Sequence, residues 1–318
     1  MKVTVTGGAG FIGANLCRAL ARRGVETVVL DDLSTGRRTH LEGLDVDLRV
    51  DSVLNRDAVA DACAGADAVV HLAAVPSVSR SLVAPRRSHD VNVTGTLEVL
   101  ESARDAGAHV VLASSSSVYG NNPVLPKSED MVCRPMSPYA SSKLAAESYA
   151  LSYQHCFGLR CTAFRFFNVF GPRQMPDHAY AAVIPAFVWA ALRGEPLTVF
   201  GDGDQSRDFT FVDSVVEVLA DSVVRGVTHD DPINLAFGTR TSINEIIAVL
   251  SAVLGRRLDV VHHPPRTGDV RHSQASGAAL RSLFPLSEPV PLEVALCRTV
   301  EWMQSFVETT AQRSTVPA

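Results

Sequence analysis

The sequence lacks the features that mark membrane, disulfide-rich or nucleic-acid-binding proteins. Its best apolar stretch, 183–192, is shorter than the ~18 residues that a membrane-spanning helix needs, and it contains Pro185. The six cysteines are scattered without a CxxC pair, which argues against a disulfide framework or zinc knuckle, and we expect small buried hydrophobic side chains. A formal net charge of -5 offers no basic surface for nucleic acid.

Signs of a metal site or a targeting segment are also missing. His262 and His263 stand in a proline-rich segment without spaced Asp, Glu or Cys partners, so we predict no metal. Met1 is followed at once by a strand-like run that leaves no room for a signal peptide, so we expect a cytoplasmic protein that does not contact membranes. Lysine is rare, and each of Lys2, Lys127 and Lys143 merits inspection.

Apolar segments rich in β-branched residues alternate with helical patterns through the first half of the 318 residues. This alternation predicts parallel strands with right-handed crossovers, and hence a doubly wound α/β sheet covered on both faces. The predicted strands are 2–6, 26–30, 67–72, 108–114 and 160–167.

Helix boundaries are indicated by capping residues. Helices 11–23 and 88–106 are each followed by a glycine that can take a positive φ. A third helix begins with Ser137 as N-cap and Pro138 at its first position, and it runs to about Cys156 before Gly158.

The pattern changes after Asn168, where turn-rich segments separate short helices. We therefore expect 1–168 to form the first domain and 169–318 a smaller second α/β domain that binds the substrate. Within 208–240, segments 208–212 and 233–236 are predicted as short strands that return to the main sheet or bridge the lobes. The polar tail from Thr309 is expected to be frayed.

A glycine-rich segment, 6–13, directly follows the first predicted strand, with glycines at 7, 8, 10 and 13. Glycine has no Cβ, so the loop can turn tightly, approach a diphosphate and let the next helix pack on the strand. The helix N-terminus then offers free N–H groups and the positive end of its dipole. Strand, loop and helix in this order predict a dinucleotide site.

Two aspartates follow at the ends of later strands. Asp31 closes the second strand 18 residues after Gly13, near the usual spacing of about 20. A carboxylate there accepts hydrogen bonds from ribose hydroxyls and repels a 2′-phosphate, which favours NAD over NADP. Asp51, after the third strand region, is a second candidate beside the adenine, with helix capping as the alternative.

Tyr139 and Lys143 are four residues apart on the helix that Ser137 opens, so both project from one face. An ammonium beside a phenol lowers the phenol's pKa, which suits the tyrosine to proton abstraction. The alternative is that Lys143 pairs with Glu147 on a solvated face. A run of serines, 114–117, favours the catalytic interpretation, because it lies at the C-terminal end of a central strand, where such sheets bind ligands.

Taken together, these residues resemble the extended short-chain dehydrogenases, specifically the NAD-dependent sugar-nucleotide epimerase/dehydratase group. The resemblance covers nearly the whole chain. It is carried by TGGAGFIG (6–13), HLAAVPSV (71–78), SSSSVYG (114–120), YASSK (139–143), RFFNVFGPRQ (165–174), GDGDQSRDFTFVD (201–213) and GDVRHS (268–273).

The resemblance implies a Rossmann domain with NAD and a set of site residues. The implied catalytic triad is Ser115, Tyr139 and Lys143, and the last two also touch the cofactor. The implied surroundings of NAD are Gly7, Gly10, Phe11, Ile12, Gly13, Asp31, Asp51, Ala73 and Asn92. The implied contacts of a UDP-sugar are Ser77, Ser115, Ser116, Asn168, Val183, Phe200, Arg207, Arg266, Asp269 and Ser273.

Residues after the catalytic serine separate the reactions of this group. Members of the group that resemble 4,6-dehydratases carry an Asp-Glu pair there, and decarboxylating relatives keep a Glu. This chain has Ser116 and Ser117 instead, so the resemblance implies 4-epimerisation. Ser273 stands where epimerases of non-acetylated sugars tend to have tyrosine, so a pocket for an N-acetyl group is predicted. UDP-GlcNAc is the first choice of substrate and UDP-glucose the second. UDP-glucuronate is less favoured, because Ala182 cannot bind a carboxylate as arginine would.

Two further expectations complete the interpretation. A non-catalytic NAD-binding regulator would be expected to lose the tyrosine or the lysine, and both are present. Family precedent implies a homodimer in which each subunit contributes two helices, 88–106 and 138–156, to a four-helix bundle.

Overall fold

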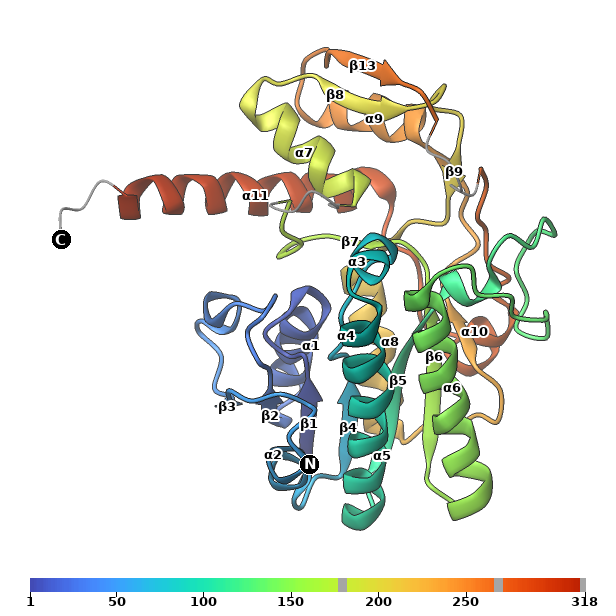
Figure 1. Cartoon of the computed structure of the whole chain (residues 1–318). Helices are drawn as coiled ribbons and strands as arrows, with labels where there is room; N and C mark the ends of the chain where they lie inside the picture. Colours follow the sequence, from blue (N-terminus) through green and yellow to red (C-terminus); the bar gives the residue numbers. More distant parts are fainter. Residues whose placement is uncertain (177–181, 266–270, 315–318) are drawn as a thin grey trace.

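A seven-stranded parallel sheet forms the centre of the molecule (Figure 1). The computed structural model describes residues 1–176, 182–265 and 271–314. The strand order is β3-β2-β1-β4-β5-β6-β11, that of a Rossmann fold. Successive strands are added on one side of β1 up to β3 and on its other side from β4 onward, so the topological switch point lies between β1 and β4. The strands are β1 (Lys2–Thr6), β2 (Glu26–Leu30), β3 (Asp47–Arg49), β4 (Ala68–His71), β5 (His109–Ser115), β6 (Cys161–Phe166) and β11 (Ile233–Leu235).

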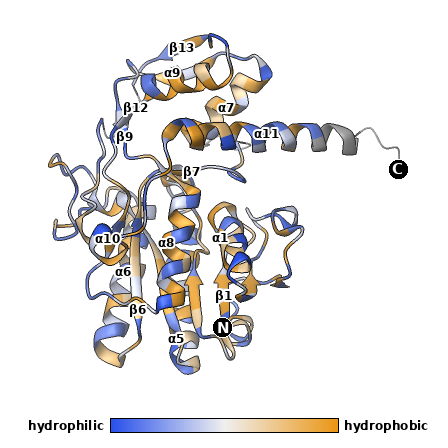
Figure 2. Ribbon diagram, turned by 180° about the vertical axis from the view of Figure 1, so that it is seen from behind, coloured by the Kyte–Doolittle hydropathy of each residue, from blue (hydrophilic) through white to orange (hydrophobic). Residues whose placement is uncertain are grey.

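Strand side chains alternate between two hydrophobic cores, as the pleat requires. Val111 of β5 packs with α1 (Phe11–Arg22) and α8 (Val212–Arg225), whereas Val110 and Leu112 pack with the helices of the other face. Those helices are α2 (Arg56–Cys63), α5 (Gly95–Ala106) and α6 (Pro138–Phe157). The central strands are hydrophobic along their length (Figure 2). The predicted doubly wound sheet is confirmed.

Helix α6 begins as predicted. The Ser137 hydroxyl accepts a hydrogen bond from the Ala140 N–H (3.1 Å), Pro138 occupies the first turn, and Gly158 ends the helix with φ 68°. The predicted helix 88–106 is instead divided into α4 (Pro85–His89), a π-helical turn η2 (Asp90–Thr94) and α5. Short helices α3 (Val78–Val83), η1 (Arg38–Leu41) and η3 (Ser116–Tyr119) lie in the connections.

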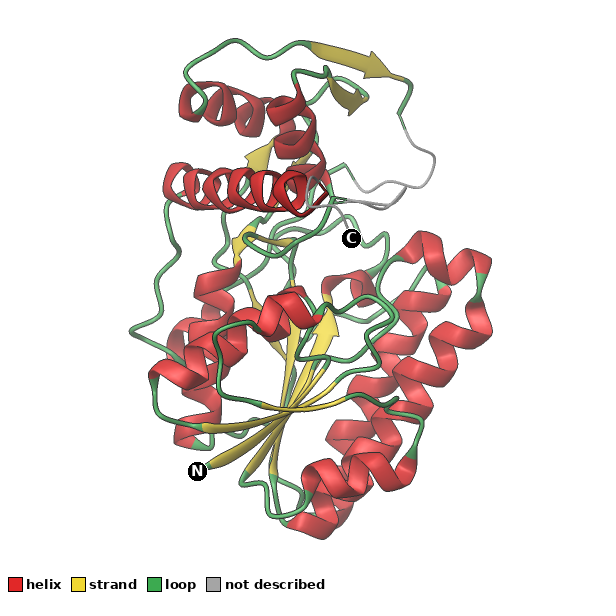
Figure 3. Ribbon diagram, turned by 90° about the vertical axis from the view of Figure 1, so that its left-hand side faces the viewer, coloured by secondary structure: helices red, strands yellow, loops and turns green. Residues whose placement is uncertain are grey.

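A smaller group of elements stands above the carboxyl edge of the sheet (Figure 3). It contains α7 (Val183–Arg193), α9 (Ile243–Val253) and the parallel pair β8 (Leu197–Phe200) and β13 (Val260–His263). Helix α11 (Leu292–Ser314) packs on α9 and α7 and extends past the sheet (Figure 1). Helix α10 (Ala278–Leu283) packs beside β11.

The structure decides where the two predicted return strands go. Segment 233–236 becomes β11 and joins the main sheet next to β6. Segment 208–212 instead contains β10 (Thr210–Phe211), which pairs with β7 (Val169–Phe170) outside the main sheet. A third small sheet joins β9 (Ser206–Arg207) to β12 (Thr241–Ser242). The tail predicted to fray from Thr309 is helical to Ser314.

Two predictions about side-chain environment are tested by this fold. None of the described helices combines the length and the apolar character needed to span a membrane. All six cysteines are free, but only Cys17, Cys63 and Cys161 are buried; Cys156 is exposed. The expectation that the cysteines are uniformly buried was therefore wrong, because Cys156 lies in the last turn of α6.

Candidate active site

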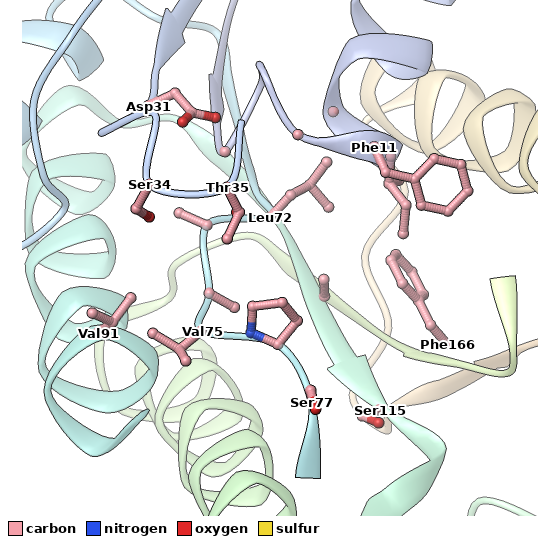
Figure 4. A pocket seen from close by; sticks show the side chains of 18 of the residues that line it. Phe11, Asp31, Ser34, Thr35, Leu72, Val75, Ser77, Val91, Ser115 and Phe166 are labelled. Carbon is pink, nitrogen blue, oxygen red and sulfur yellow. The ribbon is translucent and has the colours of Figure 1, made fainter. Parts of the chain in front are cut away.

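A cavity of about 600 Å³ opens at the carboxyl edge of the sheet (Figure 4). It is bounded by the glycine loop, the ends of β2, β4 and β5, and the start of α6. Most of the predicted cofactor and catalytic residues line it: Gly7, Gly10, Phe11, Ile12, Gly13, Asp31, Asp51, Ala73, Ser77, Ser115, Ser116, Tyr139, Lys143 and Asn168.

The glycine loop leaves no room for side chains at Gly7, Gly8 and Gly13; at Gly8 a Cβ would lie 2.7 Å from a methyl group of Val29. Gly7 has φ 71°, and a Cβ there would lie 2.7 Å from the backbone N of Ala73. A Cβ on Gly13 would lie 2.2 Å from the carbonyl oxygen of Gly7. At Gly10, which caps α1, no side chain satisfies the first N–H groups of the helix. These residues fit the diphosphate of a dinucleotide, because the first residues of α1 line the cavity and a helix N-terminus favours an anion.

Asp31 ties the end of β2 to this loop. Its carboxylate accepts hydrogen bonds from the N–H groups of Ala9 (2.9 Å) and Leu33 (2.8 Å). Burial raises the pKa of Asp31, an effect that these backbone donors partly offset. A Cβ on Gly36 would lie 2.6 Å from one Asp31 oxygen, so the loop after β2 depends on a glycine that sequence reasoning did not single out.

Asp51 also lines the cavity, but it does not cap a helix directly. Its carboxylate accepts from the Ser52 N–H (2.7 Å) and from the Asn55 side-chain amide (2.9 Å). Asn55 is the residue that caps α2, by accepting from the Ala58 N–H. Asp51 therefore orients the cap.

A directional chain of hydrogen bonds fixes the strand ends beneath the cavity. The Ala73 N–H donates to the Thr6 hydroxyl (3.3 Å), which lies 2.7 Å from His71 Nδ1. His71 Nε2 lies 2.9 Å from the Thr96 hydroxyl, which in turn donates to the Asn92 carbonyl (2.7 Å). The two hydroxyls can be satisfied together only if Nε2 carries the proton. Burial lowers the pKa of His71 to about 3, which keeps this ring neutral.

Asn92 is not among the residues that line the first cavity, and its assignment as a cofactor contact stays a prediction. Its side chain is buried and binds both backbone groups of Val75: Oδ1 accepts from the N–H (2.7 Å) and Nδ2 donates to the carbonyl (3.2 Å). Nδ2 also donates to the Ser142 hydroxyl (2.9 Å). Asn92 thereby joins the loop after β4, which does line the cavity, to α6.

The predicted triad comes together at the end of β5. Lys143 is buried and donates from Nζ to the Ala113 carbonyl (2.8 Å). The Ser115 hydroxyl is hydrogen-bonded to the Tyr139 phenol. Ser115 also accepts from the N–H and hydroxyl of Ser117 (3.2 and 2.9 Å), which fixes its position at the start of η3.

The expected acidity of Tyr139 is not found in the protein alone. Desolvation raises the pKa of Tyr139, and the hydrogen bond with Ser115 only partly offsets this rise. Burial lowers the pKa of Lys143 to about 8. In the protein alone the phenol of Tyr139 is therefore less acidic than usual, because desolvation is the larger cause. That Lys143 lowers this pKa stays a prediction.

The alternative in which Lys143 pairs with Glu147 on a solvated face is also wrong. Glu147 is 2% exposed and accepts from both Nε and Nη2 of Arg165 (3.0 and 2.7 Å). Lys143 faces the cavity on the same side of α6.

A second cavity of about 640 Å³ lies beneath α7, and it contains Val183, Phe200 and Arg207. It shares Asn168, Val169 and Ala182 with the first cavity. Arg207 donates from Nη1 to the carbonyls of Ser206 (3.0 Å) and Arg271 (3.1 Å), which holds its side chain near this wall.

Three further residues were predicted to contact the substrate, and of these only Ser273 can be compared with the two cavities. Ser273 lines neither; its N–H donates to the Ser206 carbonyl (3.0 Å), because its segment runs alongside β9. That Ser273 enlarges the sugar pocket stays a prediction. Arg266 and Asp269 lie outside the described residues.

Arg173 and His40 are among the residues that line the first cavity without having been predicted. Arg173 has φ 72° and donates to the Asn15 side chain (2.9 Å), and burial together with nearby Arg18 lowers its pKa to about 10. His40 lies with Nδ1 3.1 Å from the Ala9 carbonyl, and burial lowers its pKa to about 4. Arg173 belongs to the quoted GPRQ segment, which was the available signal. His40 had none.

Fold and site define a class: a Rossmann enzyme with a dinucleotide loop and a Ser, Tyr and Lys cluster at the edge of its sheet. A family model, the NAD dependent epimerase/dehydratase family, matches residues 3–236. The chain belongs to this family, and it is an enzyme whose cofactor is NAD.

Relatives match over almost the full length. A UDP-glucose 4-epimerase of Mycolicibacterium smegmatis is 37% identical, over 96% of this chain and 99% of its own. The structure of a UDP-N-acetylglucosamine 4-epimerase from Methanobrevibacter ruminantium, in complex with UDP-N-acetylmuramic acid, has a TM-score of 0.91, 34% identity and coverage of 96% and 98%. A Thermus thermophilus UDP-glucose 4-epimerase in complex with NAD has a TM-score of 0.86, 32% identity and coverage of 96% and 99%.

Proposed function

We propose that this protein is an NAD-dependent 4-epimerase of a UDP-hexose, with UDP-GlcNAc and UDP-GalNAc as its first-choice pair. One observation carries the proposal: Ser115, Tyr139 and Lys143 line the same cavity as the glycine loop. A hydroxyl base is thus available beside a dinucleotide site. Relatives named as 4-epimerases of UDP-glucose and of UDP-N-acetylglucosamine support the reaction class.

Tyr139 is the proposed base for the proton of the sugar 4-hydroxyl. NAD, when bound, supplies an acceptor for the hydride of C4, which it returns on the other face, and a positive ring charge that favours the tyrosinate. Ser115 lowers the pKa of Tyr139 and orients the phenol. Lys143, held on the Ala113 carbonyl, adds its ammonium charge below pH 8 or so, given its pKa of about 8.

Elimination of water or carbon dioxide would need a carboxylate as acid or base next to Ser115, and the residues that follow Ser115 carry none. The next residues, Ser116 and Ser117, line the cavity with hydroxyls. The carboxylate on the facing helix, Glu147, is bound by Arg165 and Ser114. Proton transfer at the 4-hydroxyl is the chemistry that the remaining groups support.

The choice of sugar rests on the wall that the two cavities share. Asn168, Val169 and Ala182 form it, and none of them carries a charge for a carboxylate. Ala182 is also small, which favours a hexose that bears an acetamido group. UDP-glucose is the second candidate, because a pocket roomy enough for the acetamido group also admits a hydroxyl, and the Mycolicibacterium relative bears that name.

The experiment incubates the purified protein separately with UDP-GlcNAc, UDP-glucose and UDP-glucuronate, without added NAD, and follows the products by proton NMR. We expect conversion of UDP-GlcNAc to UDP-GalNAc, supported by NAD that stays bound between turnovers. Faster conversion of UDP-glucose would establish the second candidate. Conversion of UDP-glucuronate alone would overturn the pocket argument, and no conversion of any sugar would remove the proposed reaction.

We also propose a homodimer formed through α5 and α6. Tyr149 and Phe157 of α6 are 41% and 55% exposed, and such aromatic side chains are typical of a helical interface. Sedimentation equilibrium should give twice the monomer mass of 34.0 kDa, whereas a monomer at micromolar concentration would contradict the proposal.

A further inference from the structure

An ion pair lies buried directly behind the catalytic cluster. Arg165 Nη2 and Glu147 Oε1 are 2.7 Å apart, and the two side chains are only 4% and 3% exposed. Neither side chain lines the cavity. A buried pair is costly to desolvate and contributes little net stability over an apolar pair, so its presence calls for another reason.

The register between α6 and β5 supplies that reason. Tyr139, Lys143 and Glu147 are spaced four residues apart and lie on one face of α6. Each contacts the end of β5: Tyr139 binds Ser115, Lys143 binds the Ala113 carbonyl (2.8 Å), and Glu147 accepts from the Ser114 hydroxyl (2.6 Å). The contact between Glu147 and Ser114 is therefore the third of three contacts that align α6 with the end of β5.

Arg165 fixes the position of the Glu147 carboxylate through two hydrogen bonds. Its guanidinium uses two N–H groups on the carboxylate, and it donates further to the Tyr119 hydroxyl (2.9 Å), the Glu129 carbonyl (3.2 Å) and the Cys133 sulfur (3.3 Å). These contacts account for the five N–H donors of arginine. The carboxylate, with two bonds from Arg165 and one from Ser114, is held away from the neighbouring ammonium.

We propose that Glu147 and Arg165 are a positioning pair for the reaction, which anchors α6 on β5 and keeps the Lys143 ammonium free for the active site. The inference rests on the proposed function only in assigning proton transfer to Tyr139 and Lys143. Because the pair is neutral as a whole, it supplies the anchor without trapping the lysine in a buried salt bridge.

Loss of Arg165 and loss of the Glu147 charge should shift the pKa of Lys143 in opposite directions. Without Arg165, the bare Glu147 carboxylate one helical turn away attracts the Lys143 ammonium and raises the pKa of both Lys143 and Tyr139. When Glu147 loses its charge, the bare Arg165 guanidinium repels the ammonium and lowers both pKa values. Loss of both charges together cancels the effect.

Other charged groups near this face do not change that sign. On β4 and β5, His71 and His109 stay neutral, since burial lowers their pKa values to about 3 and about 4. On η3, burial raises the pKa of Tyr119 to about 12. Burial likewise raises the pKa of the Cys133 thiol. The remaining charged groups on described elements packed against α6 are those of Arg80, Arg86, Arg87, His89, Asp90, Glu98, Glu101, Arg104, Asp105 and Glu129; none is buried.

The first measurement exploits the rarity of lysine. With only Lys2, Lys127 and Lys143 in the chain, Cε-labelled lysine gives three NMR signals, and Lys143→Arg identifies the one that matters. We expect its titration midpoint to move up by about one pH unit in Arg165→Met, down by about one in Glu147→Gln, and back in the double variant. An unchanged midpoint in Glu147→Gln overturns the inference.

The second measurement is the pH profile of epimerisation in the same variants, which should shift in the same directions. Arg165→Lys keeps the charge and should restore the profile. If Arg165→Met fails to fold, the near-isosteric Glu147→Gln and Arg165→Lys decide the question. Reduced thermal stability with wild-type midpoints and profiles would leave the pair merely structural and refute the proposal. If the wild type converts no UDP-sugar, the proposed function fails, while the lysine titration still decides the pair.

Discussion

Lys143 Nζ lies 2.8 Å from the carbonyl oxygen of Ala113, and this hydrogen bond fixes the ammonium at the carboxyl edge of the sheet. Ala113 belongs to β5 two residues before Ser115, so the strand that carries the serine also holds the lysine. The triad is thus set by one strand end and one helix face, both of which belong to rigid elements.

Replacement of Tyr139 by Phe should separate binding from chemistry. Tyr139→Phe removes the proposed base and leaves the cavity shape, so we expect turnover to fall about 10²- to 10⁴-fold while NAD remains bound. NAD content after denaturation and the rate by NMR check the two parts. Tyr149→Phe, on the exposed side of the same helix, is the control and should keep the wild-type rate. A Tyr139→Phe enzyme of normal rate would exclude the phenol as base.

Two glycines with nearly the same φ test the close approach at the dinucleotide loop. Gly24 has φ 67°, and a Cβ added there would meet no atom within 4 Å, so Gly24→Ala should cost about 1–2 kcal/mol in free energy of unfolding. Gly7→Ala adds a contact of 2.7 Å with the Ala73 backbone, so it should cost more and also abolish NAD binding. Denaturant unfolding gives the loss of stability, and the amount of bound NAD gives the loss of binding. Equal losses in Gly7→Ala and Gly24→Ala would contradict this account.

His71 predicts how stability depends on acid. Its folded-state pKa is lowered by burial to about 3, whereas the ordinary value is 6.5. Between these values the unfolded chain binds a proton at His71 that the folded chain does not, so stability present above pH 6.5 is lost as the pH falls. The loss is about 1.4 kcal/mol per pH unit. His71→Met should show a flatter profile from pH 6.5 to 4 in denaturant unfolding, and parallel profiles would contradict the prediction.

Arg173 is expected to contribute to NAD binding through its guanidinium group. It lines the first cavity, and its side chain donates to the amide oxygen of Asn15 rather than to a carboxylate, which leaves its charge for a diphosphate. Hydrogen bonds to charged groups contribute about 1.5–3 kcal/mol, so Arg173→Gln should weaken NAD binding about 10- to 100-fold. Arg22→Gln, whose partner Glu217 is on the surface, is the matched control. Equal NAD retention in both variants would exclude this role.

Local patterns predicted several elements correctly, although the predicted helix 88–106 is divided by the π-helical turn η2. Apolar segments rich in β-branched residues predicted β1 and β2 to the residue, and Ser137 with Pro138 predicted the start of α6, because strand composition and caps are local properties. The GxxGxxG spacing likewise predicted the loop that lines the cavity.

Only the tertiary structure decided the partners of individual side chains. Glu147 is four residues from Lys143 in sequence, yet Arg165 on β6 holds it. The side chain of Asn92 binds the backbone of Val75, and the Ser273 N–H binds the carbonyl of Ser206 on β9. Desolvation likewise reversed the expected shift of Tyr139. The sequence by itself determined the fold class, the dinucleotide loop and the helix that carries Tyr139 and Lys143. The pairing of charged side chains and the pKa values of the buried groups were decided by the packing of distant segments, because the spacing of residues along the chain does not encode that packing.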